Sequence, residues 1–418
     1  MDKFVIRGGR PLNGQIAVSG AKNSALPALA ASLLTAEPVV LRRIPGVRDI
    51  RTMTNLIAAT GASVSVDGET VAIRAANIER AEAPYELVKT MRASSLVLGP
   101  LVARCGRARV SMPGGCAIGA RPINLHVHGL EQLGATIAQD HGYIEAQAAG
   151  GLVGRKVHFD RITVTGTEDL MMATTLARGT TVLSNAACEP EVVDLAILLN
   201  KMGALVEGAG TPTIRIEGVE RLHGAEHEII ADRIEAGTFL CAGAMMGEGV
   251  TLKRVAPEHM KAVLDSLKQC GFPMEIGKDS ITIHPNPNAR GFDLTTLPYP
   301  GFPTDMQAQF CAMACAIPDT STITETIFPQ RFMHVAEMKR MGANIDLQGA
   351  TARIRGVDKM KGAPVMASDL RASAALVLAA IKAEGKTEIN RLYHIDRGYE
   401  HLDDKLSGLG ANLERVKG

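Results

Sequence analysis

Thr60-Gly-Ala-Ser-Val64 is the first of six segments in which a glycine separates a helix-like stretch from an alternating, strand-like one. Successive glycines lie 68 to 73 residues apart. Glycine in the left-handed conformation commonly closes a helix, and alternation of apolar and polar residues predicts a strand. We therefore interpret the chain as six copies of one α/β unit. The other copies are Leu133-Gly-Ala-Thr-Ile137, Met202-Gly-Ala-Leu-Val206, Cys270-Gly-Phe-Pro-Met274, Met341-Gly-Ala-Asn-Ile345 and Leu409-Gly-Ala-Asn-Leu413.

An amphipathic stretch precedes each of these glycines. In one copy Met260, Val263, Leu264 and Leu267 complete an apolar stripe at helical spacing. A helix with one polar face lies at the surface, so each repeat is predicted to carry one surface helix. The predicted surface helices cover residues 49–60, 124–133, 192–202, 258–270, 330–341 and 398–409.

A second set of stretches carries almost no charge and is rich in Ala, Met, Leu, Ser and Cys. Helices that are apolar on all sides lie inside a large core or a membrane. A membrane span needs about 18 uninterrupted apolar residues, and every stretch here is shorter or contains proline. Each repeat is thus predicted to contain one buried helix. These helices cover residues 24–34, 94–103, 170–177, 236–246, 306–317 and 370–381.

A chain of 418 residues exceeds what one hydrophobic core usually serves, about 250–300 residues. Short alternating runs follow the glycine-closed helices, as at 213–218 and 352–356, and predict antiparallel strands. The sixth repeat lacks such a run before Gly418, whereas residues 4–14 have the same pattern. We predict two α/β domains of three repeats each, residues 22–229 and residues 1–21 plus 230–418, with the active site in the cleft between them.

Composition excludes several classes of function. The formal net charge is +1 and aromatic residues make up 3%, with no Trp, which argues against a nucleic-acid surface. The first residues begin a strand and include no apolar targeting segment. Seven scattered cysteines without a CxxC pair suit a reducing compartment. We expect a cytoplasmic protein without a membrane segment.

Basic residues stand where several predicted helices begin. Rotation-related repeats would point equivalent helix N-termini in the same direction, and these ends bind anions. The alternative is helix capping and surface salt bridges, which contribute little when isolated. Recurrence at equivalent positions favours a site for a strongly anionic, phosphate-bearing ligand. The basic residues concerned are Lys22, Arg92, Arg121, Arg331, Arg371 and Arg397.

Ser111-Met-Pro-Gly-Gly-Cys-Ala-Ile-Gly-Ala-Arg-Pro122 is the most unusual segment, because three glycines and two prolines surround Cys116 and Arg121. A single cysteine is most often a small core residue. This composition indicates an exposed, mobile loop instead, in which nearby cations would adjust the thiol pKa. Cys116 is therefore a candidate acid or nucleophile.

Asp305 and Asp369 are the candidate carboxylates, each at a predicted helix start, and N-capping is the alternative role for both. Asp305 follows Pro300-Gly-Phe-Pro303, a rigid turn that would direct it into the cleft. The eleven histidines show no metal-ligand spacing, and the sequence contains no nucleotide-binding glycine motif.

The repeats and four motifs together resemble the enolpyruvyl transferase family, and within it the branch that acts on UDP-N-acetylglucosamine. The resemblance implies two inside-out α/β barrels built from a βαβαββ-type unit. It also implies transfer of the enolpyruvyl group of phosphoenolpyruvate to the sugar 3-hydroxyl, through a tetrahedral ketal, with release of phosphate. This reaction begins peptidoglycan precursor synthesis and needs no metal or other cofactor. The motifs are Gly20-Ala-Lys-Asn-Ser24, Pro113-Gly-Gly-Cys-Ala-Ile-Gly-Ala-Arg-Pro122, Phe302-Pro-Thr-Asp305 and Asp396-Arg-Gly-Tyr399.

The resemblance implies roles for individual residues. Cys116 would be the general acid and could form a pyruvyl adduct, Asp305 the base, and Lys22 and Arg397 further catalytic residues, with Asp369 in support. Phosphoenolpyruvate would bind to Lys22, Asn23, Arg121, Arg331, Arg371 and Arg397. UDP-N-acetylglucosamine would bind to Asn23, Arg92, Arg121, Pro122, Ile123, Asn124, Leu125, Asp160, Arg161, Ile162, Thr163, Asp305 and Ile327. The family often has an acidic residue where Asn124 stands.

Two other functions stay open at this point. A 3-phosphoshikimate-specific enolpyruvyl transferase would share the fold but lack the cysteine loop. A noncatalytic repeat scaffold would need an extended apolar or basic face rather than charges at helix ends. We expect small-molecule substrates, no nucleic-acid or membrane partner, and a monomer.

Overall fold

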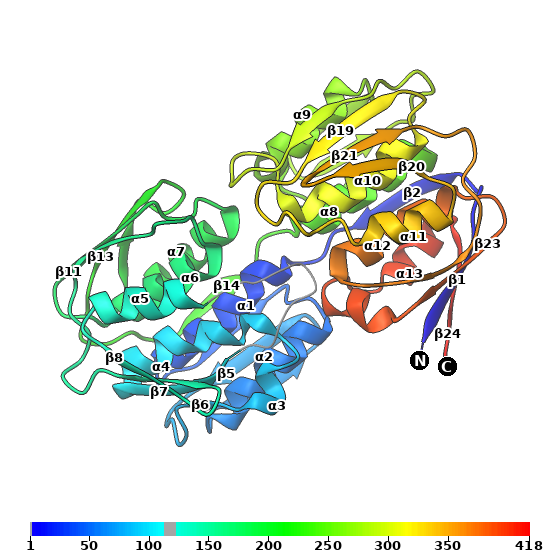
Figure 1. Cartoon of the computed structure of the whole chain (residues 1–418). Coiled ribbons are helices and arrows are strands. Elements are labelled where there is room, and N and C mark those ends of the chain that lie inside the picture. Colours follow the sequence, from blue (N-terminus) through cyan, green and yellow to red (C-terminus); the bar gives the residue numbers. More distant parts are fainter. Residues whose placement is uncertain (1, 113–122) are drawn as a thin grey trace. The chain divides into compact units, whose positions relative to one another are not determined.

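The computed structural model describes residues 2–112 and 123–418, except for the side chain of Arg92. The described chain forms two compact units (Figure 1). Residues 20–112 and 123–230 form one, called the N-unit here, and residues 2–19 and 231–418 form the other, called the C-unit.

The N-unit contains three four-stranded sheets. Their strand orders are β14 (Ala225–Glu228), β3 (Val39–Arg42), β5 (Thr70–Arg74), β4 (Ser63–Asp67); β6 (Glu82–Ala83), β7 (Arg107–Ser111), β9 (Tyr143–Gln147), β8 (Thr136–Asp140); and β10 (Lys156–His158), β11 (Thr180–Ser184), β13 (Thr213–Glu217), β12 (Leu205–Glu207). Its helices are α1 (Lys22–Ala31), η1 (Ser32–Leu34), α2 (Arg48–Ala59), α3 (Tyr85–Val88), η2 (Arg92–Val97), α4 (Leu98–Cys105), α5 (Asn124–Gln132), α6 (Val164–Thr174) and α7 (Pro190–Lys201).

The C-unit repeats this plan. Its sheets are β2 (Leu12–Ala17), β15 (Gly247–Lys253), β17 (Ser280–Ile283), β16 (Met274–Ile276); β18 (Asp293–Thr295), β19 (Thr320–Thr324), β21 (Thr351–Arg355), β20 (Asn344–Gln348); and β22 (Pro364–Met366), β23 (Lys386–Asn390), β1 (Lys3–Arg7), β24 (Asn412–Val416). Its helices are α8 (Arg233–Met246), η3 (Pro257–Met260), α9 (Lys261–Gln269), η4 (Thr304–Met306), α10 (Gln307–Ala316), α11 (His334–Arg340), α12 (Leu370–Lys382), η5 (Leu392–Arg397) and α13 (Leu402–Gly408).

All six sheets share one pairing pattern. The first two strands in each order run parallel, and the remaining pairs are antiparallel. The parallel edge strand comes from the end of another repeat, so the expectation of purely antiparallel tails was wrong for this strand. The predicted role of the N-terminal segment is confirmed, because β1 pairs with both β23 and β24 of the sixth repeat.

The repeat glycines adopt the backbone conformation that the sequence predicts. Gly61, Gly134, Gly203, Gly271, Gly342 and Gly410 have φ between 89° and 102°, and each directly follows the C-cap residue of a helix. Only glycine reaches this region without a steric penalty, which explains why the residue recurs at each helix end.

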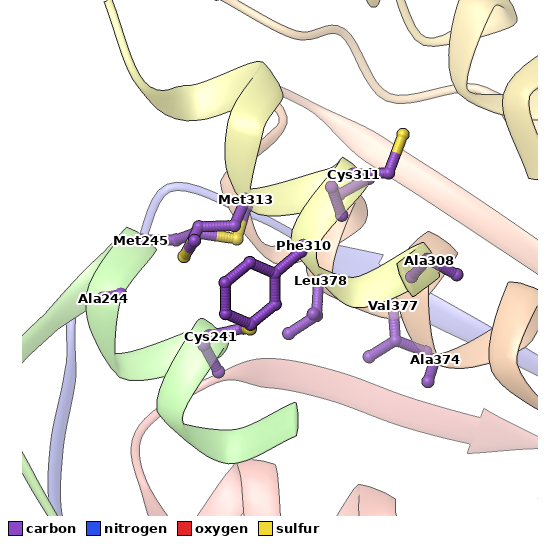
Figure 2. Packing of buried hydrophobic residues seen from close by; sticks show 14 of the residues in the cluster. Cys241, Ala244, Met245, Ala308, Phe310, Cys311, Met313, Ala374, Val377 and Leu378 are labelled. Atoms are coloured by element: carbon purple, nitrogen blue, oxygen red, sulfur yellow. The ribbon is translucent and has the colours of Figure 1, made fainter. Parts of the chain in front are cut away.

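The second set of helices lies inside each unit, as predicted. In the C-unit α8, α10 and α12 pack against one another, and nearly all of their residues are buried. Figure 2 shows Phe310 of α10 among Cys241 of α8 and Leu378 of α12. The small side chains of these helices allow this close packing, since interiors tolerate few voids. The predicted fold class, an α/β architecture with buried helices inside sheets, is confirmed.

Several element boundaries differ from the prediction. The third buried helix, α6, begins at Val164 rather than at Leu170, because polar Thr and Glu residues in its first turns hid the helical pattern. The fifth surface helix, α11, begins only at His334, and Arg331 lies buried ahead of it. Among the described residues, no helix is both long and apolar enough to cross a membrane.

Candidate active site

In the C-unit, Asp305 lies between two buried arginines. Its Oδ1 is 2.7 Å from Arg331 Nη1, and its Oδ2 accepts a hydrogen bond of 3.0 Å from Arg371 Nη2. The arginine residues are 6% and 3% exposed, whereas the Asp305 side chain is 25% exposed. Two guanidinium groups favour the ionised carboxylate. A partly exposed, anchored carboxylate of this kind can accept a proton from a substrate.

Backbone elements bring these three residues together from distant parts of the chain. Asp305 lies in η4, whose entry is fixed by Pro303, and Arg371 lies in the first turn of α12. Burial disfavours the charged form of Arg371, but Asp305, together with Tyr399 and Asp232, outweighs this effect and raises the pKa of the guanidinium above its usual value. Arg371 therefore stays cationic although it is buried. Arg331, which we expected at the start of a surface helix, lies ahead of α11 as a buried partner of Asp305, which compensates its charge.

Glu325 organises the same region and was missed by the sequence analysis. Its buried Oε1 accepts the backbone N–H groups of Ile327 and Phe328 at 2.8 and 2.9 Å. Its Oε2 accepts from Thr304 Oγ1 at 2.8 Å, and Thr304 in turn accepts from Arg331 Nη1 at 3.0 Å. Glu325 thereby fixes the candidate sugar contact Ile327 and the arginine beside Asp305. Nothing in its sequence neighbourhood distinguishes it from a surface glutamate.

Asp369 is the N-cap of α12. Its Oδ1 accepts from the backbone N–H groups of Arg371 at 2.9 Å and Ala372 at 3.0 Å. Capping, the alternative that we considered, is therefore what its carboxylate does. By holding the first turn of α12, Asp369 also fixes the residue that donates to Asp305.

Two histidines near Asp369 were also missed. His334 is 1% exposed, and burial together with Arg331 lowers its pKa to about 4 although Asp369 acts in the opposite direction. Neither of its ring nitrogens has a hydrogen-bond partner in the described part of the chain. Burial also lowers the pKa of His394, in η5. Both imidazoles are thus biased toward the neutral form.

Arg397 ends η5 and is half-buried. The neighbouring Asp396 is bound by Arg415 through contacts of 2.6 and 3.1 Å. Two residues after Arg397, Tyr399 is buried and its ring lies 5.5 Å from the guanidinium carbon of Arg371. The turn of Arg397 is therefore packed against the helix that carries Arg371.

In the N-unit, Lys22 opens α1 and is 9% exposed, with its Nζ 3.3 Å from Asp49 Oδ2 in the first turn of α2. Asn23 is half-buried beside it. Ser24 donates to Asp194 Oδ2 of α7, whose Oδ1 lies 2.9 Å from His227 Nε2. Ser24, Asp194 and His227 are all buried, and their contacts hold the start of α1 against α7.

The predicted sugar-nucleotide segments of this unit lie on neighbouring elements. Ile123 is the N-cap of α5, and Asn124 and Leu125 are its first residues. Asp160, Arg161 and Ile162 are exposed, and Thr163 caps α6 through Gly166 N at 3.2 Å. His126 of α5 joins the two elements, because it contacts Asp169 at 2.9 Å and Thr165 at 3.2 Å on α6. The structure brings these two segments together through a residue that the sequence analysis had not selected.

Three further predicted site residues, and the side chain of a fourth, lie outside the described part of the chain. Cys116, Arg121 and Pro122 lie outside the described residues. Arg92 opens η2, at the start of the second buried helix, but its side chain is likewise outside the description. The assignments of these four residues remain predictions.

The chain matches the sequence profile of a family described as EPSP synthase (3-phosphoshikimate 1-carboxyvinyltransferase) over residues 6–406. A UDP-N-acetylglucosamine 1-carboxyvinyltransferase from Solibacter usitatus (strain Ellin6076) is 62% identical to it over 418 residues, which is 100% of both chains. A protein of the same name from Koribacter versatilis (strain Ellin345) is 57% identical, covering 100% of this chain and 97% of the relative. Among solved structures, the enolpyruvyl transferase NikO from Streptomyces tendae superposes with a TM-score of 0.91 at 26% identity, covering 100% of this chain and 99% of NikO.

Proposed function

Because the chain belongs to the EPSP synthase (3-phosphoshikimate 1-carboxyvinyltransferase) family, we propose that it is an enolpyruvyl transferase whose acceptor is UDP-N-acetylglucosamine. It transfers the enolpyruvyl group of phosphoenolpyruvate to the sugar 3-hydroxyl and releases phosphate, the step that begins peptidoglycan precursor synthesis. The observation that carries this proposal is the 62% identity, without truncation, to a relative that bears the name of this reaction.

The arrangement of charges around Asp305 supports this chemistry. Phosphoenolpyruvate carries a phosphate and a carboxylate, so its binding needs several fixed cations, and we assign Lys22, Arg331, Arg371 and Arg397 to it. Two of these arginines are buried and held by Asp305, which reduces the reorganisation needed when an anion binds. We assign the residues of both units to the same reaction, with the N-unit segments 123–125 and 160–163 and Ile327 of the C-unit contacting the sugar nucleotide.

The proposed mechanism is an addition followed by an elimination. Protonation of the methylene carbon of phosphoenolpyruvate, by Cys116 in our assignment, creates positive charge on the adjacent carbon. The sugar oxygen attacks this carbon while Asp305 takes the hydroxyl proton, and a tetrahedral ketal results. The new methyl group then loses a proton as the C–O bond to phosphate breaks, which restores the double bond. General acid–base assistance of this kind contributes about a hundred- to ten-thousand-fold.

We further assign the two units as the two domains of a monomeric, cytoplasmic enzyme. In support, each of the six described cysteines is free rather than in a disulfide, which suits a reducing compartment. Size-exclusion chromatography with light scattering would check the monomer.

Phosphate release from phosphoenolpyruvate tests the proposed function, with UDP-N-acetylglucosamine and shikimate 3-phosphate compared as acceptors. We expect turnover only with the nucleotide sugar, and turnover with shikimate 3-phosphate alone would overturn the proposal. Asp305→Asn should lower kcat by about a hundredfold or more. The matched control is Asp293→Asn, an exposed aspartate of β18 in the same unit, which should leave kcat unchanged.

A further inference from the structure

Tyr399 is a buried residue to which the proposed mechanism assigns no role. The residue is 3% exposed and follows η5 in the same turn as Arg397. Its hydroxyl oxygen lies 2.8 Å from Thr238 Oγ1 of α8 and 3.2 Å from Gln309 Nε2 of α10. The guanidinium carbon of Arg371 of α12 lies 5.5 Å from the centre of its ring. One side chain thus connects the Arg397 turn to all three buried helices of the C-unit, α8, α10 and α12.

The partners of this phenol fix the direction of its hydrogen bonds. Thr238 Oγ1 donates its single proton to Ile234 O at 2.8 Å, so it can only accept from Tyr399. Gln309 Nε2 donates to the carbonyl oxygen of Asp305 at 3.0 Å, and this contact determines which end of the amide faces the phenol. The Tyr399 hydroxyl therefore donates to Thr238 and accepts from Gln309, whose Nε2 also lies 3.1 Å from Thr238 Oγ1.

The same groups hold Asp305 from two sides. Arg371 donates to its carboxylate Oδ2 at 3.0 Å, and Gln309 donates to its backbone carbonyl at 3.0 Å. The turn itself is packed tightly, because a Cβ atom at Gly398 would come within 2.6 Å of the Leu370 side chain at the start of α12. A displacement of the phenol would therefore release the donors that orient Asp305 together with the turn that carries Arg397.

We propose that Tyr399 is a positioning residue. Through its contacts with Arg371, Gln309 and Thr238, it holds the Asp305 carboxylate and the Arg397 turn in fixed positions relative to each other. This inference rests on the proposed function, in which Asp305 is the base and Arg397 binds phosphoenolpyruvate. Tyr399 itself need not touch a substrate. A positioning role predicts that loss of the hydroxyl lowers the rate of the chemical step while the affinity for the sugar nucleotide is unchanged.

Steady-state kinetics of Tyr399→Phe tests the proposal. The variant keeps the ring and removes only the hydroxyl, and we expect kcat to fall about ten- to a hundredfold, as for a change that leaves buried hydrogen-bonding groups without a partner. KM for UDP-N-acetylglucosamine should stay within about twofold, in line with the positioning argument. The matched control is Tyr393→Phe, an exposed tyrosine of η5 that should behave as wild type.

Thr238 supplies a second pair of variants. Thr238→Val removes the acceptor of the phenol proton and should lower kcat in the same way. Thr238→Ser keeps the hydroxyl, so its kcat should stay close to that of wild type. Because both changes break one network, the double variant Thr238→Val/Tyr399→Phe should lose less than the product of the two single losses. This pair keeps the test decisive if Tyr399→Phe fails to fold.

Hydrogen exchange followed by mass spectrometry provides a readout that needs no activity. In the substrate-free protein, Tyr399→Phe should speed exchange in peptides covering 395–400, and Tyr393→Phe should not. If wild type shows no turnover with UDP-N-acetylglucosamine yet this exchange still rises, the proposed function fails and the network through Tyr399 stands. Wild-type exchange in Tyr399→Phe, or equal losses in kcat and in affinity for both substrates, would overturn the positioning role.

Discussion

A fall in pH from 7 to 4 should destabilise the C-unit through one buried side chain, His334. This histidine opens α11 and is 1% exposed. Burial and the nearby Arg331 lower its pKa from 6.5 to about 4, and the opposing influence of Asp369 is too weak to compensate. Its ring has no hydrogen-bond partner among the described residues that could stabilise the protonated form. His334 therefore binds a proton more weakly in the folded C-unit than in the unfolded chain.

The size and sign of the effect follow from these two pKa values. Above pH 6.5 the imidazole is neutral in both states and contributes no pH dependence. Between pH 6.5 and about 4 the unfolded state binds the proton first, so the free energy of unfolding falls as the pH falls. At about 1.4 kcal/mol for each pH unit, the loss is about 3 kcal/mol. Below about pH 4 the folded state is protonated too, and His334 causes no further loss.

Comparison of wild type with His334→Gln isolates this contribution from that of the carboxylates. Glutamine of similar polarity does not titrate, so the variant should lose less stability than wild type between pH 7 and 4. Urea titrations at several pH values, followed through hydrogen exchange in α12 peptides, report the unfolding of the C-unit alone. The difference between the two proteins should grow by about 3 kcal/mol across this range.

Parallel stability curves for wild type and His334→Gln would refute the reasoning, because they would mean that His334 takes up its proton equally in both states. A nuclear magnetic resonance titration of the His334 ring gives an independent check. A midpoint near 6.5 in the folded protein would contradict the burial argument directly.

Three further predictions follow from the structure. Asp369→Ala should lower the free energy of unfolding of the C-unit by about 1 kcal/mol, whereas Asp369→Asn should retain most of the cap, as measured by urea denaturation. Burial raises the pKa of each of the six described thiols, of Cys270 to about 11 and of Cys315 to about 12. Because the thiolate is the reactive form, an epoxide analogue of phosphoenolpyruvate should label Cys116 first. Peptide mass spectrometry that finds another cysteine modified first would remove Cys116 from the mechanism. Arg397→Ala should raise KM for phosphoenolpyruvate far more than KM for UDP-N-acetylglucosamine, and equal changes in steady-state kinetics would contradict its assignment.

The fold was largely predictable because its strongest signals are local. Each repeat glycine closes a helix through its own backbone geometry, so Gly61 and its five counterparts could be interpreted without tertiary information. The absence of charge similarly identified α8, α10 and α12 as buried helices. The start of α6 was misplaced because Thr167, Glu168 and Asp169 are polar yet buried, and residue type alone does not reveal compensating contacts.

Pairings between distant segments were harder to predict. The parallel edge strand of each sheet comes from another repeat, and no residue within the strand specifies that neighbour. The position of Arg331 ahead of α11, in a buried ion pair, was missed for a related reason, since a basic residue near a predicted helix start suits the surface equally well. Glu325, His334 and His126 gave no signal, because their roles depend on partners that only the folded chain brings close.

The repeat period itself nevertheless carries information about the site that was not used in the sequence analysis. Asp305 and Arg371 are 66 residues apart, Thr238 and Gln309 are 71 apart, and the contact between Gly99 and Asp169 spans 70 residues. All three separations are close to the spacing of the repeat glycines, because equivalent buried helices of successive repeats pack side by side. Polar residues one period apart on buried helices are therefore candidate partners. By this rule Asp305–Arg371 follows from the sequence, whereas Arg331, which lies within the same repeat as Asp305, does not.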